Sequence, residues 1–228
     1  MKVSLIHDWL TGMRGGERVL EILCELYPEA DIFTLIHVKE SVSETIESHK
    51  IITSFLQNMP LSRTKYRYYL PLMPGAIERF NLKAYDLVIS TSHCVAKGIM
   101  QREDALHICY CHTPMRYIWD MYDEYFGKGR SGILARFGIK FFRKKLQGWD
   151  VKSSKRVNYF IANSKNIAEK VKKYYNRDAE VIYPPVDTEK FTPTSEQTED
   201  FYLVVSAFAP YKRVDLAIEA FNILGYPL

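Results

Sequence analysis

Short apolar runs recur along this chain and are separated by segments long enough to form helices. The runs lie at residues 3–7, 31–36, 86–90, 106–111, 159–162 and 180–183. Several are apolar at consecutive positions, which is typical of strands that helices cover on both faces. Two of the intervening segments, 17–26 and 165–174, carry apolar residues at helical spacing. Strand and helix therefore alternate, and the pattern predicts an α/β fold built on a doubly wound parallel sheet.

A polar stretch toward the carboxyl end divides the chain. Residues 188–200 are rich in Thr, Ser, Glu, Gln and Asp, as expected of a linker. Beyond it, the pattern predicts one strand at 201–208 and one helix at 214–224, which together are too small to enclose a core. We therefore expect a complete Rossmann-like domain over 1–187. Residues 201–228 would then begin a second Rossmann-like domain, which is truncated here.

The chain carries no sign of export or of a membrane span. Its first apolar run ends at His7, and no run approaches the ~20 apolar residues that a spanning helix needs. We therefore expect a cytoplasmic protein. The four cysteines form no C-x-x-C pair and lack zinc-finger spacing, so we expect them to be reduced and buried; they are Cys24, Cys94, Cys109 and Cys111.

Positive charge is concentrated in one stretch. The net charge is only +4, but residues 128–156 carry ten basic side chains and one acid, Asp150. Large apolar residues are interspersed with these charges, which predicts a basic amphipathic helix. Two interpretations are open. The helix packs its apolar face on the domain and leaves its basic face in solvent, or it docks on the anionic inner face of a membrane together with residues 63–70. A nucleic-acid partner is not expected.

A glycine-rich loop follows the first predicted strand and opens the first helix. Its sequence is Gly12-Met13-Arg14-Gly15-Gly16-Glu17. Glycines let the backbone approach a ligand closely, and the free amides of a helix N-terminus attract anionic or hydroxyl-rich groups. The spacing is not G-x-G-x-x-G, which disfavours a dinucleotide-dependent oxidoreductase. Glu17 either contacts a ligand or only complements the helix dipole.

Two further places along the chain carry candidate site residues. His112 directly follows the run at 106–111, where ligands bind in open α/β sheets, although a histidine there is often only structural. Lys212 and Arg213 precede the last predicted helix and suit a diphosphate, although such pairs are also common on surfaces. No D-x-D, H-E-x-x-H, P-loop or G-x-S-x-G motif is present, so we expect neither a metal nor a cofactor.

Taken in this order, these pieces resemble the family 4 glycosyltransferases of GT-B architecture, which are retaining enzymes that use nucleotide-diphosphate sugars. The resemblance covers essentially the whole chain. Besides the glycine loop and His112, it rests on Ile161-Ala162-Asn163-Ser164, on Val181-Ile182-Tyr183-Pro184-Pro185-Val186-Asp187, and on the stretch from Tyr211 to Phe221. The last two of these are the most specific.

The resemblance implies roles for the candidate residues. The loop would border the donor phosphates at Gly15 and Gly16 and the acceptor at Arg14 and Glu17. His112 would touch the donor sugar as the catalytic residue. In the second domain, Lys212 and Arg213 would hold the diphosphate.

The resemblance also implies a reaction. The donor would be a nucleotide sugar with a hexose, best mannose from GDP-mannose, and the acceptor a glycan or a lipid-linked sugar in polysaccharide or cell-surface glycan biosynthesis. The family's glutamate-rich donor motif lies beyond the first helix of its second domain, so we expect the chain to be inactive alone. The alternative is a non-catalytic acceptor-binding module whose donor domain is a separate chain.

Overall fold

The computed structural model describes residues 1–120, 133–189, 192, 200–206, 208 and 212–228, and only the backbone of residues 133–141. Two compact units are present, Met1–Pro185 and Val186–Leu228. The first unit holds the sheet and all the site residues that precede residue 186.

The first unit is built on one parallel sheet, in agreement with the predicted α/β fold. Its strand order is β3-β2-β1-β4-β5-β6-β7. The strands are β1 Val3–His7, β2 Asp31–Thr34, β3 Ile51–Thr53, β4 Leu87–Ser92, β5 Leu106–Cys111, β6 Tyr159–Ala162 and β7 Ala179–Val181. The order reverses at β1, which lies between β2 and β4, and its last residue, His7, pairs with Thr34 and Thr91. This reversal places the end of β1 where doubly wound sheets bind their ligands.

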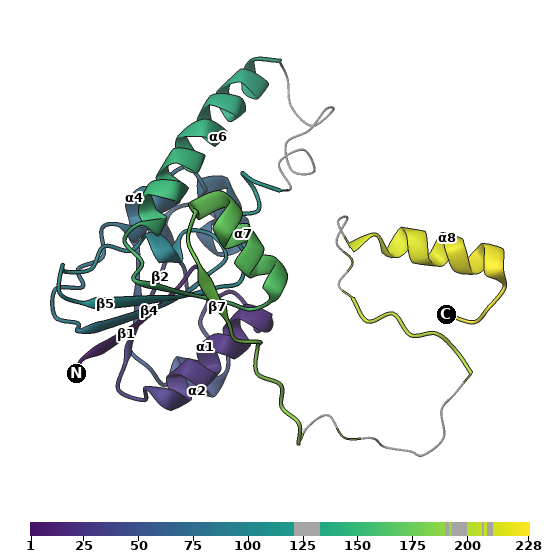
Figure 1. Cartoon of the computed structure of the whole chain (residues 1–228), viewed down its shortest axis with the longest axis horizontal. Coiled ribbons are helices and arrows are strands. Elements are labelled where there is room, and N and C mark those ends of the chain that lie inside the picture. The colour runs from purple at the N-terminus through teal and green to yellow at the C-terminus, as the bar shows by residue number, and fades with distance from the viewer. Residues whose placement is uncertain (121–132, 190–191, 193–199, 207, 209–211) are drawn as a thin grey trace. The chain divides into compact units, whose positions relative to one another are not determined.

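Helices cover both faces of the sheet (Figure 1). The helices α1 and α2 lie on one face, and α4, α6 and α7 lie on the other. The bounds are α1 Gly15–Leu26, α2 Glu44–Glu47, η1 Phe55–Asn58, α3 Ser62–Lys65, η2 Tyr66–Tyr69, α4 Met73–Ile77, η3 Ala96–Gly98, α6 Ile133–Ser154 and α7 Lys165–Tyr175. Right-handed crossovers explain why the connections on the two sides of β1 fall on opposite faces.

Alternation along the strands builds a core on each face. On β1, Ile6 points into a cluster with Leu146 of α6, whereas Leu5 points into a cluster with Leu20 of α1. A third cluster joins β5, β6 and α7. Because consecutive positions face opposite layers, both must be apolar, and this requirement produces the continuous apolar runs of the sequence.

A buried polar cluster fastens α6 to its neighbours. Asp150 of α6 is fully buried and receives hydrogen bonds from Trp119 Nε1 and the Tyr175 hydroxyl, each at 2.8 Å. It also pairs with the ammonium group of Lys97 in η3, which is fully buried too. Burial lowers the pKa of Lys97, but the charge of Asp150 outweighs this effect and the pKa is raised. Lys97 is therefore held in its charged, protonated form.

The described part of the basic stretch packs on the domain. Leu146 is buried, and Phe142 and Trp149 pack against the same cluster, while Lys144 and Lys145 are exposed. Packing of the apolar face of the basic helix on the domain is therefore confirmed for residues 142–154, and the basic face is exposed. The side chains of 128–141 lie outside the part of the chain whose side chains are described.

Three features differ from the sequence-based expectations. The short strand β3 was not predicted, and β7 begins at Ala179, before the predicted 180–183. The strand predicted at 201–208 does not form in the described residues 201–206 and 208. A strand forms through hydrogen bonds to a neighbouring strand, and none of the described strands pairs with this segment.

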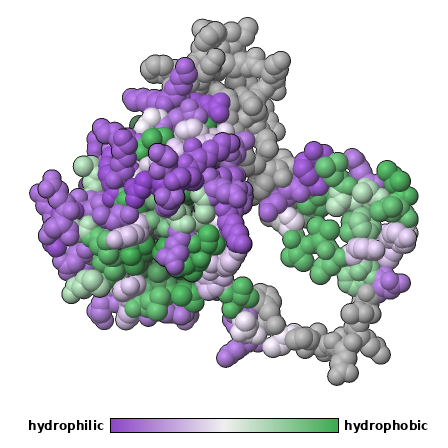
Figure 2. Space-filling model, in the orientation of Figure 1, coloured by the Kyte–Doolittle hydropathy of each residue, from purple (hydrophilic) through white to green (hydrophobic). Residues whose placement is uncertain are grey.

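The described residues of the second unit form one helix, α8 Val214–Leu224, at the predicted position. Gly225 ends it in the left-handed conformation, with φ of 71°. The Tyr202 ring packs on Phe221 at 4.9 Å between ring centroids, and the Tyr202 amide donates to the Pro227 carbonyl. Large apolar side chains of this unit nevertheless lie at its surface, as Figure 2 shows in green.

Two expectations about the whole chain concern membranes and cysteines. No helix among the described residues is long and apolar enough to cross a bilayer. All four cysteines are free thiols and are buried, as predicted. Burial raises the pKa of Cys24 and of Cys109 to about 12, so both stay protonated and unreactive.

Candidate functional site

Polar side chains from β1, the β4–η3 loop, the end of β5 and the start of α1 meet at the carboxyl edge of the sheet. Asp8, which follows β1, organises the loop. Its carboxylate is fully buried and accepts four backbone amides, from His93, Cys94, Val95 and Ala96, at 2.6–2.9 Å. Burial raises the pKa of Asp8, but the charge of His93 and the amide donors outweigh it, and the net shift is downward. Asp8 is therefore an ionised anchor for this loop.

His7 is the last residue of β1 and is fully buried. Its Nδ1 hydrogen-bonds with the Thr91 hydroxyl at 2.6 Å. Its Nε2 lies 3.6 Å from Glu17 Oε1, which is too long for a hydrogen bond, and has no other partner among the described residues. The imidazole is thus fixed on one side and unsatisfied on the other.

His112 directly follows β5. Its imidazole lies near that of His7, because both border the same glycine, Gly16. Its Nε2 is buried without a hydrogen-bond partner among the described residues. Burial, helped by the charges of His7 and His93, lowers the pKa of His112 to about 3. The imidazole is therefore neutral at physiological pH, and its Nε2 has no protein partner among the described residues.

The glycine loop lies next to both imidazoles. A methyl group at Gly16 would lie 3.5 Å from both His112 Nε2 and His7 Cε1, so Gly16 borders the two imidazoles. Gly15 is exposed, with no atom within 4 Å of a would-be Cβ. Gly12 has φ of +146°, a conformation that side chains rarely adopt. We call this group of His7, His112 and Gly16 the histidine slot.

Arg14 and Glu17 cap the N-terminus of helix α1. The Arg14 amide donates to Glu17 Oε2 at 3.1 Å, which is one half of a capping box. Burial raises the pKa of Glu17, but contact with His7 outweighs it, and the pKa is lowered. Glu17 is therefore an anion 5% exposed, beside His7 and the helix N-terminus. The Arg14 side chain is exposed.

His93 joins this group from the β4–η3 loop. Its Nδ1 lies 3.1 Å from Asp8 Oδ2, and its ring packs edge-on against Trp9 at 4.5 Å. Burial lowers the pKa of His93, although Asp8 acts in the opposite direction. His7, Asp8 and His93 were not among the predicted site residues. The signal was present, because each lies at the carboxyl end of a parallel strand.

The structure brings together the predicted residues of the first unit. Gly16 and His112 border the slot, Glu17 contacts His7, and Gly15 and Arg14 lie at the adjacent helix start. Lys212 and Arg213 belong to the second unit. There, Arg213 has φ of 48° and donates hydrogen bonds to Asp215 from both Nε and Nη2, with Nη2 at 2.9 Å from Oδ2.

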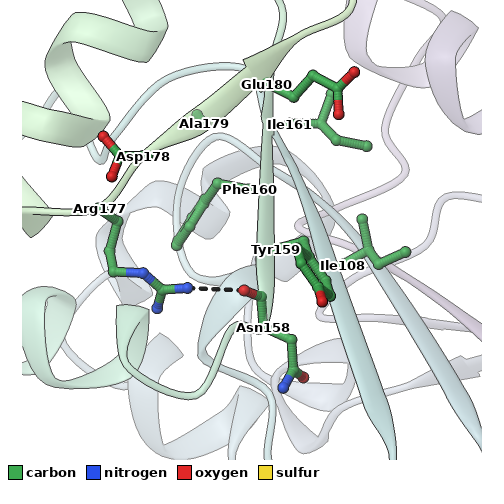
Figure 3. A pocket seen from close by; sticks show the side chains of 9 residues that line it. All are labelled: Ile108, Asn158, Tyr159, Phe160, Ile161, Arg177, Asp178, Ala179 and Glu180. Carbon is green, nitrogen blue, oxygen red and sulfur yellow. Dashed lines mark hydrogen bonds between the residues drawn. The ribbon is translucent and has the colours of Figure 1, made fainter.

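An open hollow lies elsewhere on the same unit (Figure 3). It is bordered by residues before and within β6 and β7, such as Asn158, Tyr159 and Glu180, so it lies at the amino edge of the sheet. Arg177 Nη2 donates to the Asn158 carbonyl there at 2.9 Å. The hollow shares no residue with the histidine slot. Within the described ranges, no group of three or more His, Cys, Asp or Glu is arranged to hold a metal ion.

Comparison with known proteins identifies relatives. Residues 13–190 match the model of Glycosyltransferase Family 4. No curated protein sequence matches this chain.

Solved structures also resemble the chain. One is the apo form of the lipopolysaccharide outer core galactosyltransferase WaaB, with 15% identity and a TM-score of 0.48. Another is the wall teichoic acid polymerase TagF, with 12% identity and a TM-score of 0.38. The alignments cover 88% and 78% of this chain, but only 51% and 37% of those proteins. The chain thus spans about half or less of the length of these structures.

Proposed function

This chain belongs to glycosyltransferase family 4, and from this premise we propose that the protein transfers a hexose from a nucleotide-diphosphate sugar to a hydroxyl group. The acceptor is a glycan or a lipid-linked sugar, and the anomeric configuration is retained. The observation that carries the proposal is the histidine slot. A buried imidazole nitrogen without a protein partner, beside a glycine at a helix N-terminus, suits a ligand that carries both hydroxyl and phosphate groups.

The charge state of the slot supports binding of a neutral sugar. His112 is neutral, so its Nε2 exchanges a single hydrogen bond with a sugar hydroxyl without adding charge. The amides of Gly15 and Gly16 lie in the first turn of α1, where the helix dipole favours an anionic phosphate. Arg14 and Glu17 lie at the adjacent helix entrance, where an acceptor hydroxyl would approach.

We propose that catalysis rests on positioning and charge stabilisation. The departing diphosphate takes the proton of the acceptor hydroxyl on the face of the sugar from which it leaves. The new glycosidic bond then forms on that same face as the old one breaks. His112 orients the sugar, and Lys212 and Arg213 would stabilise the charge that develops on the diphosphate.

Mannose is the proposed sugar and GDP-mannose the proposed donor, in assembly of a polysaccharide or cell-surface glycan. The support is the resemblance of the Pro184-Pro185-Val186-Asp187 and Tyr211-Lys212-Arg213 stretches to mannosyltransferases of this kind. A cytoplasmic location, at the inner face of the membrane, accords with a nucleotide-sugar donor.

A donor panel tests the proposal. The protein, in the longest form that its gene encodes, is incubated with GDP-mannose, UDP-glucose and UDP-galactose, with and without a membrane lipid extract as acceptor. Acceptor-dependent release of GDP and an α-linked product by NMR are expected. Acceptor binding without release of any nucleoside diphosphate would instead support the non-catalytic module.

Replacing His112 tests whether it orients the sugar. We expect His112→Ala to lower kcat at least about 100-fold, because the sugar loses its orienting contact, while the melting temperature changes by only a few degrees. Steady-state kinetics and thermal unfolding of the same preparations provide the comparison. Parallel losses of activity and stability would return His112 to a structural role.

Gly16→Ala is the companion variant. Its methyl group has ordinary contact distances to both imidazoles, so the fold tolerates it, but it occupies the slot. Alanine also favours a helix over glycine by up to about 1 kcal/mol. Unchanged or raised stability with loss of transfer is therefore expected.

A further inference from the structure

The connection between β3 and β4 carries an unusual surface. Residues 55–79 of this connection form the short helices η1, α3, η2 and α4. Their inner side is fixed by Leu56, Tyr66, Met73 and Ile77, which are all buried in the cluster beneath the sheet. The opposite side of these short helices must therefore face outward. We call it the outer face of the helical connection.

Large apolar side chains project from this outer face. Phe55, Leu61, Tyr68 and Leu72 are all exposed, with Leu61 63% and Tyr68 78% exposed. Single exposed apolar residues are ordinary, but four within one short connection mark an interaction surface. The short helices contact one another, and the Tyr69 hydroxyl bonds the Pro60 carbonyl at 2.6 Å, so the four belong to one compact structure.

A leucine at position 61 does not stabilise the fold, for two reasons. Its backbone is left-handed, with φ of 55°, a conformation that favours glycine or asparagine. Its side chain gains little from burial, because most of it is in solvent. Neither local conformation nor core packing explains a leucine at this position.

The outer face is also positively charged. Arg63, Lys65, Arg67 and Arg79 are exposed, and the Arg79 guanidinium lies 5.0 Å from the centre of the Phe55 ring. The single acid of residues 55–79, Glu78, accepts hydrogen bonds from Trp149 and Arg156. Its charge is therefore already matched by Arg156. Cations next to aromatic and leucine side chains are the composition of a membrane-interface surface.

We propose that the outer face of the helical connection docks the protein on an anionic lipid bilayer. Leu61, Tyr68 and Leu72 enter the boundary between headgroups and acyl chains, and Arg63 and Lys65 contact the lipid phosphates. The proposal does not rest on sugar transfer.

Charge complementarity favours a bilayer over other partners. A second copy would bring the same cations together, and like charges would repel. A soluble acidic protein would match the cations, but it gives no reason for an aromatic and two leucines distributed over several short helices. An anionic bilayer satisfies both components at once.

Vesicle co-sedimentation of the 228-residue chain tests the proposal. Vesicles of phosphatidylcholine alone are compared with vesicles that contain a third phosphatidylglycerol, at low and at 0.5 M salt. Binding to the anionic vesicles and its weakening by salt are expected. Neutralising one cation at a membrane surface weakens binding by about fivefold, so Arg63→Gln with Lys65→Gln should weaken it by about 25-fold.

Leu61→Asn separates docking from folding. Asparagine tolerates the left-handed backbone, so the melting temperature should stay equal or rise, while vesicle binding falls. The matched controls are Leu26→Asn, at an exposed leucine of α1, and Lys172→Gln with Lys173→Gln on α7. Neither control should change vesicle binding.

Several outcomes would overturn the proposal. They are absence of binding to anionic vesicles, equal losses in the control and test variants, and a dimer in sedimentation velocity that Leu61→Asn abolishes. The first outcome would show that the outer face of the helical connection does not bind an anionic bilayer. The second would indicate attraction by net charge alone, and the third would assign the surface to a second copy of the chain.

Discussion

Asp8 shows how one residue joins two distant parts of the sheet. It follows β1, yet the amides it accepts belong to the loop after β4, some 85 residues later in the chain. This loop also carries His93, so the position of the polar groups near the histidine slot depends on a single buried carboxylate. The residue that builds the site is thus distinct from those expected to contact the ligand.

Asp8→Asn tests this role. An amide side chain retains one acceptor oxygen and turns its NH2 group toward backbone donors, leaving buried N–H groups unsatisfied. Because each such group costs about 1–3 kcal/mol, we expect a loss of at least about 3 kcal/mol in the free energy of unfolding, measured in urea. Asp178→Asn, at an exposed acid paired with Lys172, should change it by less than about 1 kcal/mol. Equal effects would contradict the anchoring role.

The buried histidines make stability depend on pH. Burial is the main reason that the pKa of His107 and of His112 falls to about 3, whereas an unfolded chain titrates near 6.5. The unfolded state therefore takes up protons first as the pH falls. Stability is full above about pH 6.5 and is lost progressively toward pH 3.

The size of this pH-dependent loss of stability can be measured by unfolding in urea at pH 7 and at pH 5. Each of these two imidazoles lowers the free energy of unfolding by about 2 kcal/mol over that interval. His107→Asn should be less stable at pH 7, because the contact with Ser90 changes, but its loss between the two pH values should be about 2 kcal/mol smaller. An unchanged pH dependence would show that His107 is not buried in the neutral form.

Part of the site was predictable from single residues. His112 and the glycine loop were identified because each follows a predicted strand, and the structure places them beside one another at Gly16. The same rule applies to His7 and Asp8, which end the first apolar run. Their importance comes from contacts with Thr91 and the following loop, which only the pairing of β1 with β4 creates. Sequence patterns contain no information on such long-range contacts.

At the scale of elements, η3 and α6 meet at an unusually close contact. A methyl group at Gly98 would overlap the Trp149 ring, so the two elements approach as closely as a glycine allows. Lys97, the neighbour of Gly98, pairs with Asp150, the neighbour of Trp149. The Gly98–Trp149 contact and the Lys97–Asp150 ion pair therefore both hold α6 against η3.

Gly98→Ala should force these elements apart. We expect a loss of about 1–3 kcal/mol in the free energy of unfolding, as for other overpacked cores. The control is Gly148→Ala, in α6 with no atom within 4 Å of its would-be Cβ, which should stabilise the helix by up to about 1 kcal/mol. Trp149→Leu should recover part of the loss in the double variant, measured by a double-mutant cycle in urea. Additive losses would contradict direct contact.

Helices and strands were predicted correctly where the same pattern of apolar residues continued along the whole element. The apolar runs located β1, β5 and β6 because buried parallel strands leave a continuous signal. The strand β3 has only three residues, Ile51–Thr53, and the connection after it consists of helices too short to show a period. The segment at 201–208 has the composition of a strand but no partner among the described residues, and composition alone cannot supply one.

At the scale of the whole molecule, the two units differ in how their cores are made. The three clusters of buried apolar side chains all come from residues of Met1–Pro185. In α8, by contrast, no residue is buried, although its sequence is apolar on one side. The free energy that holds the fold together therefore comes from the first unit.

A chain that ends at Pro185 should fold as the 228-residue chain does. All three clusters and the histidine slot remain, so we expect the melting temperature of the two chains to agree within about 2 °C, measured by circular dichroism and calorimetry. Limited proteolysis of the longer chain should cleave first within residues 186–228, since segments with few buried contacts open most readily. A fall of 5 °C or more in the shorter chain would show that residues 186–228 stabilise the sheet. In that case the first unit would not be an independent folding domain, and the stability changes expected for Asp8→Asn and Gly98→Ala would have to be measured against the longer chain.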